Sequence, residues 1–215
     1  MRVFGLAAGV LIVAGLAAAA DAKPFPFRKD DLGKVPAGWK AAQTGQGMSV
    51  WKVVEDRTAP SKGGFALAQT TDDGNALFNL CVADGTNLKE VEVSVAFKAT
   101  AGKKDQGGGV VWRYQDANNY YVARMNPLED NFRVYKVVGG KRSAEFQNAE
   151  VKIPAGEWHT LKVKMVGDHI ECFVDDKKYL DVKDGTFTGA GRVGLWTKAD
   201  AQTSFDNFTV KDLGK

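Results

Sequence analysis

The sequence predicts an all-β protein in which two antiparallel sheets pack face to face as a sandwich or barrel. After the first 22 residues, apolar and polar side chains alternate over most segments, as in a strand that buries one face. Turn-forming residues separate these segments, and the sequence shows neither a helical apolar stripe nor an internal repeat. Strands with one apolar face each must bury those faces against one another, so two packed sheets are expected.

Residues 1–22, MRVFGLAAGVLIVAGLAAAADA, predict a secretory signal peptide. Arg2 precedes a long apolar run, and the small residues Ala20 and Ala22 provide an exit before Lys23. An uncleaved membrane anchor is the alternative, although the Ala- and Gly-rich run is slightly shorter than the ~20 residues of a spanning helix. We therefore expect a periplasmic or secreted protein that begins at Lys23 and has no membrane contact after cleavage.

The remaining chain predicts a single domain preceded by a short connecting segment. Residues 23–38 are interrupted by Pro and Gly and are expected to form an irregular lead-in, so the sandwich domain is assigned to residues 39–215. Roughly 190 residues are enough for one hydrophobic core. The net charge of +3 is small and the basic residues are spread along the chain, which argues against a nucleic-acid partner.

The predicted strands follow one another along the chain with turns between them. The clearest is KEVEVSVAF, and its apolar positions are Val91, Val93, Val95 and Phe97. The stretch WRYQDANNYYVARMNP, residues 112–127, follows as a hairpin that turns at its polar break, and residues 139–140 (Gly-Gly) mark a second hairpin. Three further alternating segments complete the pattern: HTLKVKMV, HIECFVD and GRVGLWT.

Three segments carry a family resemblance: GGGVVWRYQDANNYYVARMNPLEDNFRVYKVVGGKR, GEWHTLKVKMVGDHIECFVDDKKYLDV and GRVGLWTKADAQTSFDNFTV. Together they resemble the concanavalin A-like lectin/glucanase superfamily, and within it laminin-G-like bacterial domains and the 3-keto-disaccharide hydrolase (family 16 glycoside hydrolase-like) domain. The resemblance runs from about Trp39 to Val210. It implies a two-sheet antiparallel jelly-roll sandwich with one concave sheet, but no particular activity, because this fold hosts lectins, lyases, hydrolases and adhesion modules.

Alternation divides the hairpin at 112–127 into two faces. Trp112 and Tyr121 are assigned to the core, and the intervening side chains turn outward. Together with outward side chains of later strands, these predict a ligand-binding concave face made of Arg113, Tyr120, Arg124, Glu171, Phe173, Trp196 and Lys198. Aromatic faces contact the C–H face of a sugar, and guanidinium and carboxylate groups bond its hydroxyls. The alternative is an ordinary solvated sheet, and one bulge would reverse a face.

The solvent-facing assignment also predicts the effect of mutation. Truncating an exposed Arg113, Tyr120 or Arg124 to Ala is expected to change stability by less than ~1 kcal/mol. Truncating the core residues Trp112 or Tyr121 is expected to cost about 3–5 kcal/mol.

A catalytic site is less clearly indicated than a binding face. The family 16 glucanase pattern, Glu-x-Asp-x-(x)-Glu on one strand, is approached by Glu90 and Glu92, but Ser94 stands where a third acid would fall. The sequence therefore argues against a retaining glucanase. The resemblance alone implies a hydrolase or lyase acting on 3-keto-glycosides, and whether the protein is an enzyme stays uncertain. The candidate catalytic residues, which alternate onto one face of a strand, are His169, Glu171 and Asp175.

Two features leave structural alternatives open. Cys81 and Cys172 form either a disulfide, which export would permit, or two buried thiols. The acidic pairs at 72–73, 129–130 and 175–176 are either turns or ligands of a structural calcium ion. No cofactor is expected, and we assign no metal ligand.

Three functions are compatible with the sequence. The first is an exported carbohydrate-binding domain that holds a glycan on its concave sheet. The second is the 3-keto-glycoside hydrolase or lyase, for which carboxylates and histidine should converge in a closed pocket. The third is a structural or adhesion module that binds protein through a flat face with paired charges. The expected partner is a carbohydrate or glycoside, and the sequence does not determine the oligomeric state.

Overall fold

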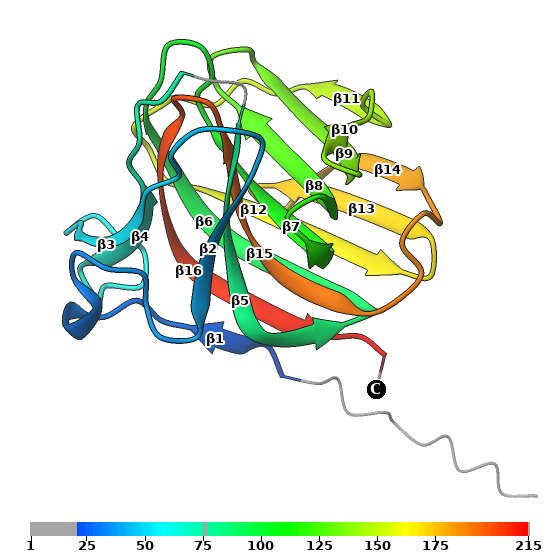
Figure 1. The fold of residues 1–215 in the computed structure, drawn as a ribbon, viewed down its shortest axis with the longest axis horizontal. Helices are drawn as coiled ribbons and strands as arrows, with labels where there is room; N and C mark the ends of the chain where they lie inside the picture. The colour runs from blue at the N-terminus through cyan, green and yellow to red at the C-terminus, as the bar shows by residue number, and fades with distance from the viewer. Residues whose placement is uncertain (1–20, 75–76, 215) are drawn as a thin grey trace, which may run out of the picture.

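The structure is a computed structural model that describes residues 21–74 and 77–214. Two antiparallel sheets lie face to face, as the sequence predicts, and the described residues form one short 3-10 helix, η1 (Lys29–Asp31) (Figure 1). In this part of the chain, no helix is long and apolar enough to cross a membrane. The predicted signal peptide lies almost entirely outside the described residues and stays a prediction.

Each sheet contains eight strands, all of them paired antiparallel. Sheet A follows the order β14 (Lys177–Lys183), β13 (His169–Val174), β12 (His159–Val166), β6 (Val91–Ala101), β16 (Gln202–Asp212), β4 (Phe65–Gln69) and β3 (Trp51–Glu55), and β1 (Lys23–Phe25) also pairs with β16. Sheet B follows the order β10 (Lys141–Arg142), β9 (Asn131–Val138), β8 (Asn119–Asn126), β7 (Gly108–Asp116), β15 (Gly191–Lys198), β5 (Phe78–Leu88) and β2 (Trp39–Thr44), and β11 (Gln147–Glu150) pairs with β9.

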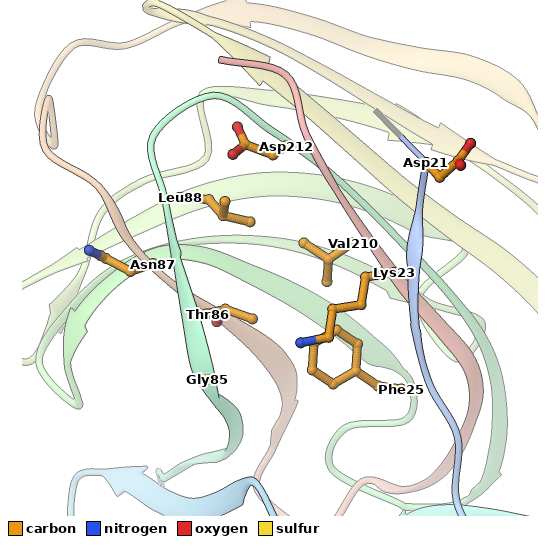
Figure 2. A pocket seen from close by; sticks show the side chains of 9 residues that line it. All are labelled: Asp21, Lys23, Phe25, Gly85, Thr86, Asn87, Leu88, Val210 and Asp212. Carbon is orange, nitrogen blue, oxygen red and sulfur yellow. The ribbon is translucent and has the colours of Figure 1, made fainter. Parts of the chain in front are cut away.

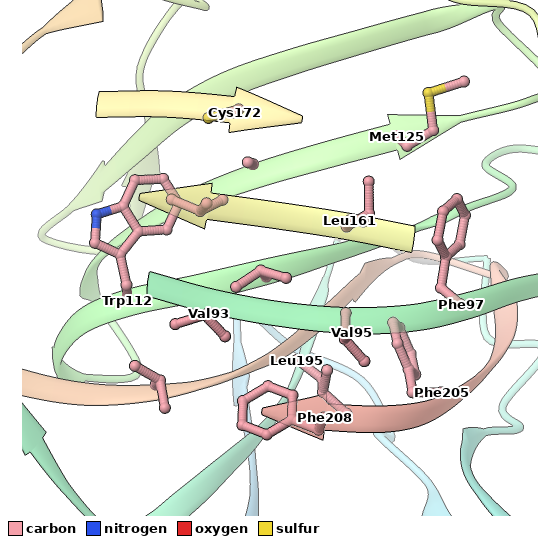
Figure 3. Close-up of a cluster of buried hydrophobic side chains, with 14 of the residues drawn as sticks. Val93, Val95, Phe97, Trp112, Met125, Leu161, Cys172, Leu195, Phe205 and Phe208 are labelled. Carbon is pink, nitrogen blue, oxygen red and sulfur yellow. The ribbon is translucent and has the colours of Figure 1, made fainter. Parts of the chain in front are cut away.

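The hydrophobic core lies between the two sheets and is built from the alternating positions that the sequence predicts. Figure 3 shows Val93, Val95 and Phe97 of β6 in this core together with Trp112 of β7. The rings of Trp112 and Tyr121 stack 5.5 Å apart, and neither side chain has exposed surface. The core assignments of both residues are confirmed, because alternation along a regular strand reliably separates its two faces.

Both cysteines lie in this core as free thiols. Cys81 is on β5 and Cys172 on β13, in different sheets, and both are fully buried. Burial raises the pKa of each thiol above its ordinary value, so neither forms a reactive thiolate at neutral pH. Of the two alternatives that the sequence leaves open, the structure contains the buried thiols.

The segment before residue 39 contributes to the sandwich instead of only leading into it. Residues Lys23–Phe25 pair with the stretch from Val210 to Phe208 on β16. The Phe25 ring lies 5.6 Å from that of Phe208 and 6.0 Å from that of Trp39. The Pro and Gly residues that follow end this strand early, which explains why no alternation is visible there.

Strand β7 contains a bulge that ends its regular alternation. Arg113 has a positive φ of 45°, and the β7–β8 register shifts between Trp112 and Asp116. Gly191 on β15 approaches so closely that a Cβ there would lie 2.5 Å from the Arg113 carbonyl carbon. The bulge therefore ends the assigned alternation of β7 after Trp112, whereas on β8 the assigned faces hold, with Tyr121 in the core and Tyr120 on the opposite face.

Candidate functional site

The outer face of sheet B curls inward until distant strands meet. In strand order, β8 and β2 are separated by β7, β15 and β5. Nevertheless, the Thr44 hydroxyl on β2 donates to the Ala117 carbonyl in the β7–β8 turn and lies 2.9 Å from the Tyr120 hydroxyl on β8. Contact between strands so far apart in the sheet requires a concave face, and this is the face on which the sequence predicts a ligand.

A second apolar cluster fills the centre of the concave face. Its members are Leu80, Val82, Val111, Tyr114, Tyr120, Val122, Tyr135, Val137 and Trp196. Tyr120 and Trp196 have no exposed surface, and the ring of Tyr120 stacks 5.9 Å from that of Tyr114. The Arg142 guanidinium lies 4.4 Å from the Tyr135 ring centre. The expectation that Tyr120 and Trp196 are exposed to a ligand is wrong, because the curled sheet buries them in an aromatic layer.

One end of the concave face carries a buried ionic network centred on Arg124. This side chain is 2% exposed and Asp105 is 1% exposed. The Nη1 atom of Arg124 lies 3.2 Å from an Asp105 carboxylate oxygen, and Nη2 donates to Glu129 and Asn131, at 2.7 Å each. Lys198 donates to the same Asp105 at 3.0 Å. The structure brings Arg124 and Lys198 together as predicted, but Arg124 is a buried structural cation and not a solvent-facing contact.

Arg113 is also buried, at the opposite end of the same sheet. Because of the bulge, its guanidinium leaves the concave face and donates to three backbone carbonyls, those of Lys89, Phe187 and Gly167, at 2.7–2.9 Å. Burial lowers the pKa of Arg113 from its ordinary value, although the nearby Glu90 carboxylate acts in the opposite direction. Its expected position on the ligand-binding face is therefore wrong, for the reason that a bulge reverses strand parity.

An open hollow of about 210 Å³ remains on the concave face beside the hairpin tip. It is lined by Lys40, Ala42, Val82, Tyr114, Gln115, Asp116 and Arg192. Tyr114 and Val82 are buried and form its floor, whereas Lys40 and Asp116 are exposed at its rim. The Arg192 guanidinium lies 5.9 Å from the Tyr114 ring centre and bonds the Asp84 carboxylate at 2.5 Å. This arrangement combines an aromatic floor with charged and amide groups around it. We call it the Tyr114 hollow.

Glu171 and Phe173, which the sequence places on the ligand-binding face, lie on the other sheet. Both point outward from β13 in sheet A, where the Lys162 ammonium lies 4.9 Å from the Phe173 ring centre. Residue alternation shows that such side chains share a face of their own strand, but it does not show which sheet the strand enters. The seven residues that were predicted to form one ligand-binding face are therefore divided between two sheets. Four of them, Arg113, Tyr120, Arg124 and Trp196, are buried.

The outer face of sheet A gathers one cluster of titratable side chains. His169, Glu171 and Asp181 offer ligand atoms that all lie within 4.8 Å of one another. The imidazole Nε2 of His169 lies 2.7 Å from Asp181, and Lys178 donates to both Glu171 and Asp181. The hydrogen bond from Lys178 lowers the pKa of Glu171. Glu171 is consequently an ionised carboxylate at neutral pH and does not suit the role of a general acid.

Asp175 does not join this cluster, in contrast to its predicted place beside His169. It lies in the β13–β14 turn with a positive φ of 48°, which ends the strand alternation. Its carboxylate accepts from the Thr160 backbone N–H at 2.8 Å and lies 2.7 Å from Nδ1 of His159. The neighbouring Asp176 accepts from Lys162. The acidic pair at 175–176 thus serves the turn and its ion pairs.

Comparison with known families decides which family this fold represents. Residues 29–211 match the family described as the 3-keto-alpha-glucoside-1,2-lyase-like domain. The chain belongs to this family. The match covers most of the chain and confirms the resemblance read from the sequence motifs.

Similarity to individual proteins supports the same fold for this 3-keto-alpha-glucoside-1,2-lyase-like domain. It is 28% identical over 176 residues to a levanase from Bacillus subtilis (strain 168), which is 80% of this chain and 24% of the levanase. The chain therefore spans about a quarter of that relative. It superposes on the carbohydrate-binding module CBM66 from Bacillus subtilis with a TM-score of 0.65 and 20% identity, covering 81% of this chain and 96% of the module.

A further solved domain also shares the architecture. The exoplasmic/lumenal domain of VIP36, in its Ca2+/Man-bound form, superposes with a TM-score of 0.58 at 14% identity and covers 88% of both chains. At this level of identity, the likeness establishes the jelly-roll sandwich and does not transfer a binding site.

A larger hollow at one end of this lyase-like domain is shaped by its N-terminal segment. Figure 2 shows its nine lining residues, contributed by β1, β5, β16 and the chain before β1: Asp21, Lys23, Phe25, Gly85, Thr86, Asn87, Leu88, Val210 and Asp212. Its volume is about 460 Å³. Asp21 belongs to the predicted signal peptide, so cleavage before Lys23 would remove part of the wall. This dependence makes it a weaker candidate site than the Tyr114 hollow.

Sequence reasoning missed the residues that form the Tyr114 hollow. Alternation assigns Arg192 to the outward face, but the bulge at Arg113 determines where Tyr114 and Asp116 lie. The one sequence signal for this site was the polar turn of the β7–β8 hairpin. Its residues contact strand β2 on the far side of the sheet and so line the hollow. No local pattern indicates how far a hairpin tip bends over a sheet.

Proposed function

We propose that this domain binds carbohydrate in the Tyr114 hollow of its concave sheet. The observation that carries the proposal is the composition of the hollow, in which the Tyr114 ring forms the floor beside the Arg192 guanidinium. Aromatic rings contact the C–H face of a sugar, and a guanidinium donates directional hydrogen bonds to its hydroxyls. The family match, the levanase relative and the carbohydrate-binding module of the same fold all support this ligand class.

The shape of the concave face limits how a glycan is held. The aromatic layer and the covering Arg142 close the centre of the sheet, so a long chain has no groove to follow there. The open volume of about 210 Å³ is below the ~300 Å³ at which typical ligand pockets begin. We therefore expect the hollow to hold one sugar unit, at a chain end or on a branch.

Substitution of Arg192 tests the proposal. Arg192→Ala is expected to weaken binding about tenfold to a hundredfold, because one or more charge-assisted hydrogen bonds are lost. Isothermal titration with levan, inulin and α-glucosides measures the affinity. Arg133→Ala is the matched control, since Arg133 is on the same sheet outside the hollow and bonds Asn148. The proposal fails if Arg192→Ala binds each ligand of the native protein with unchanged affinity.

The family description favours a second candidate function, elimination on a 3-keto-glucoside. Such a reaction needs a base to remove the proton from the carbon beside the ketone while the neighbouring glycosidic oxygen departs. The His169–Asp181 pair is the group that supports this role, because the carboxylate orients the imidazole. Turnover of a 3-keto-glucoside is the assay. His169→Gln is expected to abolish turnover, whereas Asp176→Asn is expected to leave it unchanged, and activity in His169→Gln would remove this role.

A further inference from the structure

A groove of about 520 Å³ lies on the outer face of sheet A, on the side of the sandwich opposite the Tyr114 hollow. Its lining residues are Pro60, Ser94, Ala96, Trp158, His159, Thr160, Asn207 and Thr209. The floor consists of short side chains from three adjacent strands, because Ser94 pairs with Thr209 and Ala96 with Thr160. Farther along β12, the outward side chains are Lys162 and Lys164, so the space is confined to one end of the sheet.

Trp158 forms one wall of this groove and is held in a fixed position. Its Nε1 donates to the Thr58 hydroxyl at 2.9 Å, and the same oxygen accepts from Lys98 at 3.0 Å and donates to Asp56 at 2.6 Å. A hydroxyl offers one donor and two acceptor positions, so all three positions of Thr58 are used. The indole N–H is therefore engaged by the protein, and the Lys98 ammonium lies over the ring, 5.0 Å from its centre. The opposite face of the ring is what Trp158 offers to a ligand.

The groove is also lined by a loop that is anchored to the buried part of sheet A. Pro60 lies in this loop, and the next residue, Ser61, donates its backbone N–H to Asp206 at 2.7 Å. Asp206 is 1% exposed, and the adjacent Asn207 has a positive φ of 50° at a register shift of β16. The bulge turns Asn207 out of the strand alternation and toward solvent at the edge of the groove.

The charges around the groove are already paired, whereas several neutral polar groups are not. Lys98 forms an ion pair with Asp56, and Asp175 lies against His159. In the described part of the chain, the side chains of Ser94, Asn207 and Thr209 form no hydrogen bond. An anionic ligand would approach the carboxylates of both pairs, and a purely apolar ligand would leave these hydroxyl and amide groups unbonded. A neutral ligand rich in hydroxyls suits the groove best.

We propose that this groove, which we call the Trp158 groove, is a second carbohydrate-binding site. It takes a neutral sugar unit against the Trp158 ring, with hydroxyl and amide partners from β6 and β16. The ligand class rests on the proposed function, but the site shares no residue with the Tyr114 hollow. Sites on opposite sheets allow one molecule to engage two chains or two branches of a polysaccharide. Binding to a polymer is then stronger than binding to a short sugar.

Two-dimensional ¹H–¹⁵N NMR of the intact domain tests this proposal site by site. The probes are fructose, glucose, mannose, sucrose and levan oligosaccharides up to about 100 mM, a range that includes Kd values weaker than ~1 mM. In Arg192→Ala protein, at least one sugar is expected to shift the Trp158 indole signal and the Thr160 and Thr209 amides. Trp158→Ala should weaken this response at least about tenfold, whereas Trp158→Phe, which keeps an aromatic ring, should retain it.

The two sites fail independently in this experiment. Shifts at Gln115 and Arg192 of the native protein without shifts around Trp158 would overturn the second site and uphold the Tyr114 hollow. Shifts around Trp158 alone would uphold the second site and overturn the hollow. No shift at either site with any of the probes would overturn both. Because these shifts are measured in native and Arg192→Ala protein, the outcomes do not depend on the folding of Trp158→Ala.

Discussion

At the scale of single residues, two arginines of the β7–β8 hairpin act as internal ties. Arg113 bonds three carbonyls from separate segments, and Arg124 bonds a buried carboxylate and an amide. Arginine suits both positions because its planar fork of donors is satisfied by several fixed acceptors at once. Each side chain stabilises one end of sheet B, and neither is available to a ligand.

The Arg124 network makes a quantitative prediction about stability. Arg124→Met removes a cation from a buried ion pair and leaves Asp105 with fewer partners, so the free energy of unfolding should fall by about 3–5 kcal/mol. Urea denaturation measures this loss. Arg133→Met, on a half-buried side chain of the neighbouring strand, should cost less than ~1 kcal/mol. Similar stabilities for the two variants would contradict the structural role of Arg124.

Asp184 gives the stability a predictable dependence on pH. Desolvation raises its pKa, but hydrogen bonds from Lys136, Tyr121 and Thr186 outweigh it and hold the pKa at about 2, below the usual 3.8. A carboxylate with a lowered pKa stabilises the folded state above its unfolded pKa, and this contribution is lost as pH falls from about 5 toward 2. The contribution at neutral pH is on the order of 2 kcal/mol, with about half lost by pH 3.

Asp184→Asn isolates this contribution. The stability difference between native protein and Asp184→Asn should be largest near pH 7 and should shrink at about pH 3 in urea denaturation. Asp168→Asn is a suitable control, since Asp168 is exposed, and its effect should be small at both pH values. A difference for Asp184→Asn that is constant over this range would contradict the prediction.

At the scale of elements, strands β7 and β15 approach their neighbours closely through glycines. A Cβ at Gly109 would lie 2.6 Å from the Ala123 carbonyl oxygen on β8, and one at Gly194 would lie 2.4 Å from the Cys81 carbonyl oxygen on β5. Both glycines are at strand positions that face the concave side of sheet B. Gly109 pairs with Trp196, and Gly194 is two residues before Trp196 on β15. Close backbone approach is a recurrent reason for glycine inside a strand.

Gly109→Ala tests this close approach. The added methyl group meets backbone, which cannot move aside without disturbing the β7–β8 ladder, so a loss of about 1–3 kcal/mol is expected. Gly189→Ala is the matched control, because a Cβ there meets nothing within 4 Å and its φ is not in the left-handed region. Its effect should be near zero. Thermal melts compare the two, and equal melting temperatures would refute the close approach.

At the scale of the whole molecule, the sandwich presents different surfaces on its two sheets. Sheet B turns its outer face into a second, mostly closed aromatic layer with one open hollow. Sheet A keeps a solvated, ion-paired outer face with the Trp158 groove at one end. The two proposed sites therefore lie on opposite sides of one rigid core, which suits the engagement of extended polysaccharide.

Export is a prediction that also belongs to the whole molecule. Cleavage before Lys23 would leave β1 intact on β16, where Phe25 packs against Phe208. N-terminal sequencing of periplasmic or secreted protein should therefore begin at Lys23, and material that begins at Met1 would contradict it. A chain that starts at Lys23 should melt like the longer one, whereas a chain that starts at Pro26 should melt at a lower temperature because it lacks the Phe25 contacts.

The fold class, the strand faces and most of the core follow from the amino-acid sequence alone. Val93, Val95 and Trp112 could be placed from alternation, because the two faces of a strand are defined by its own residues. The places of Arg113 and Arg124 and the closure of the concave face emerge only in three dimensions. A bulge, a curled sheet and the contact of Trp158 with Thr58, 100 residues away, depend on partners from distant segments, which local periodicity does not record.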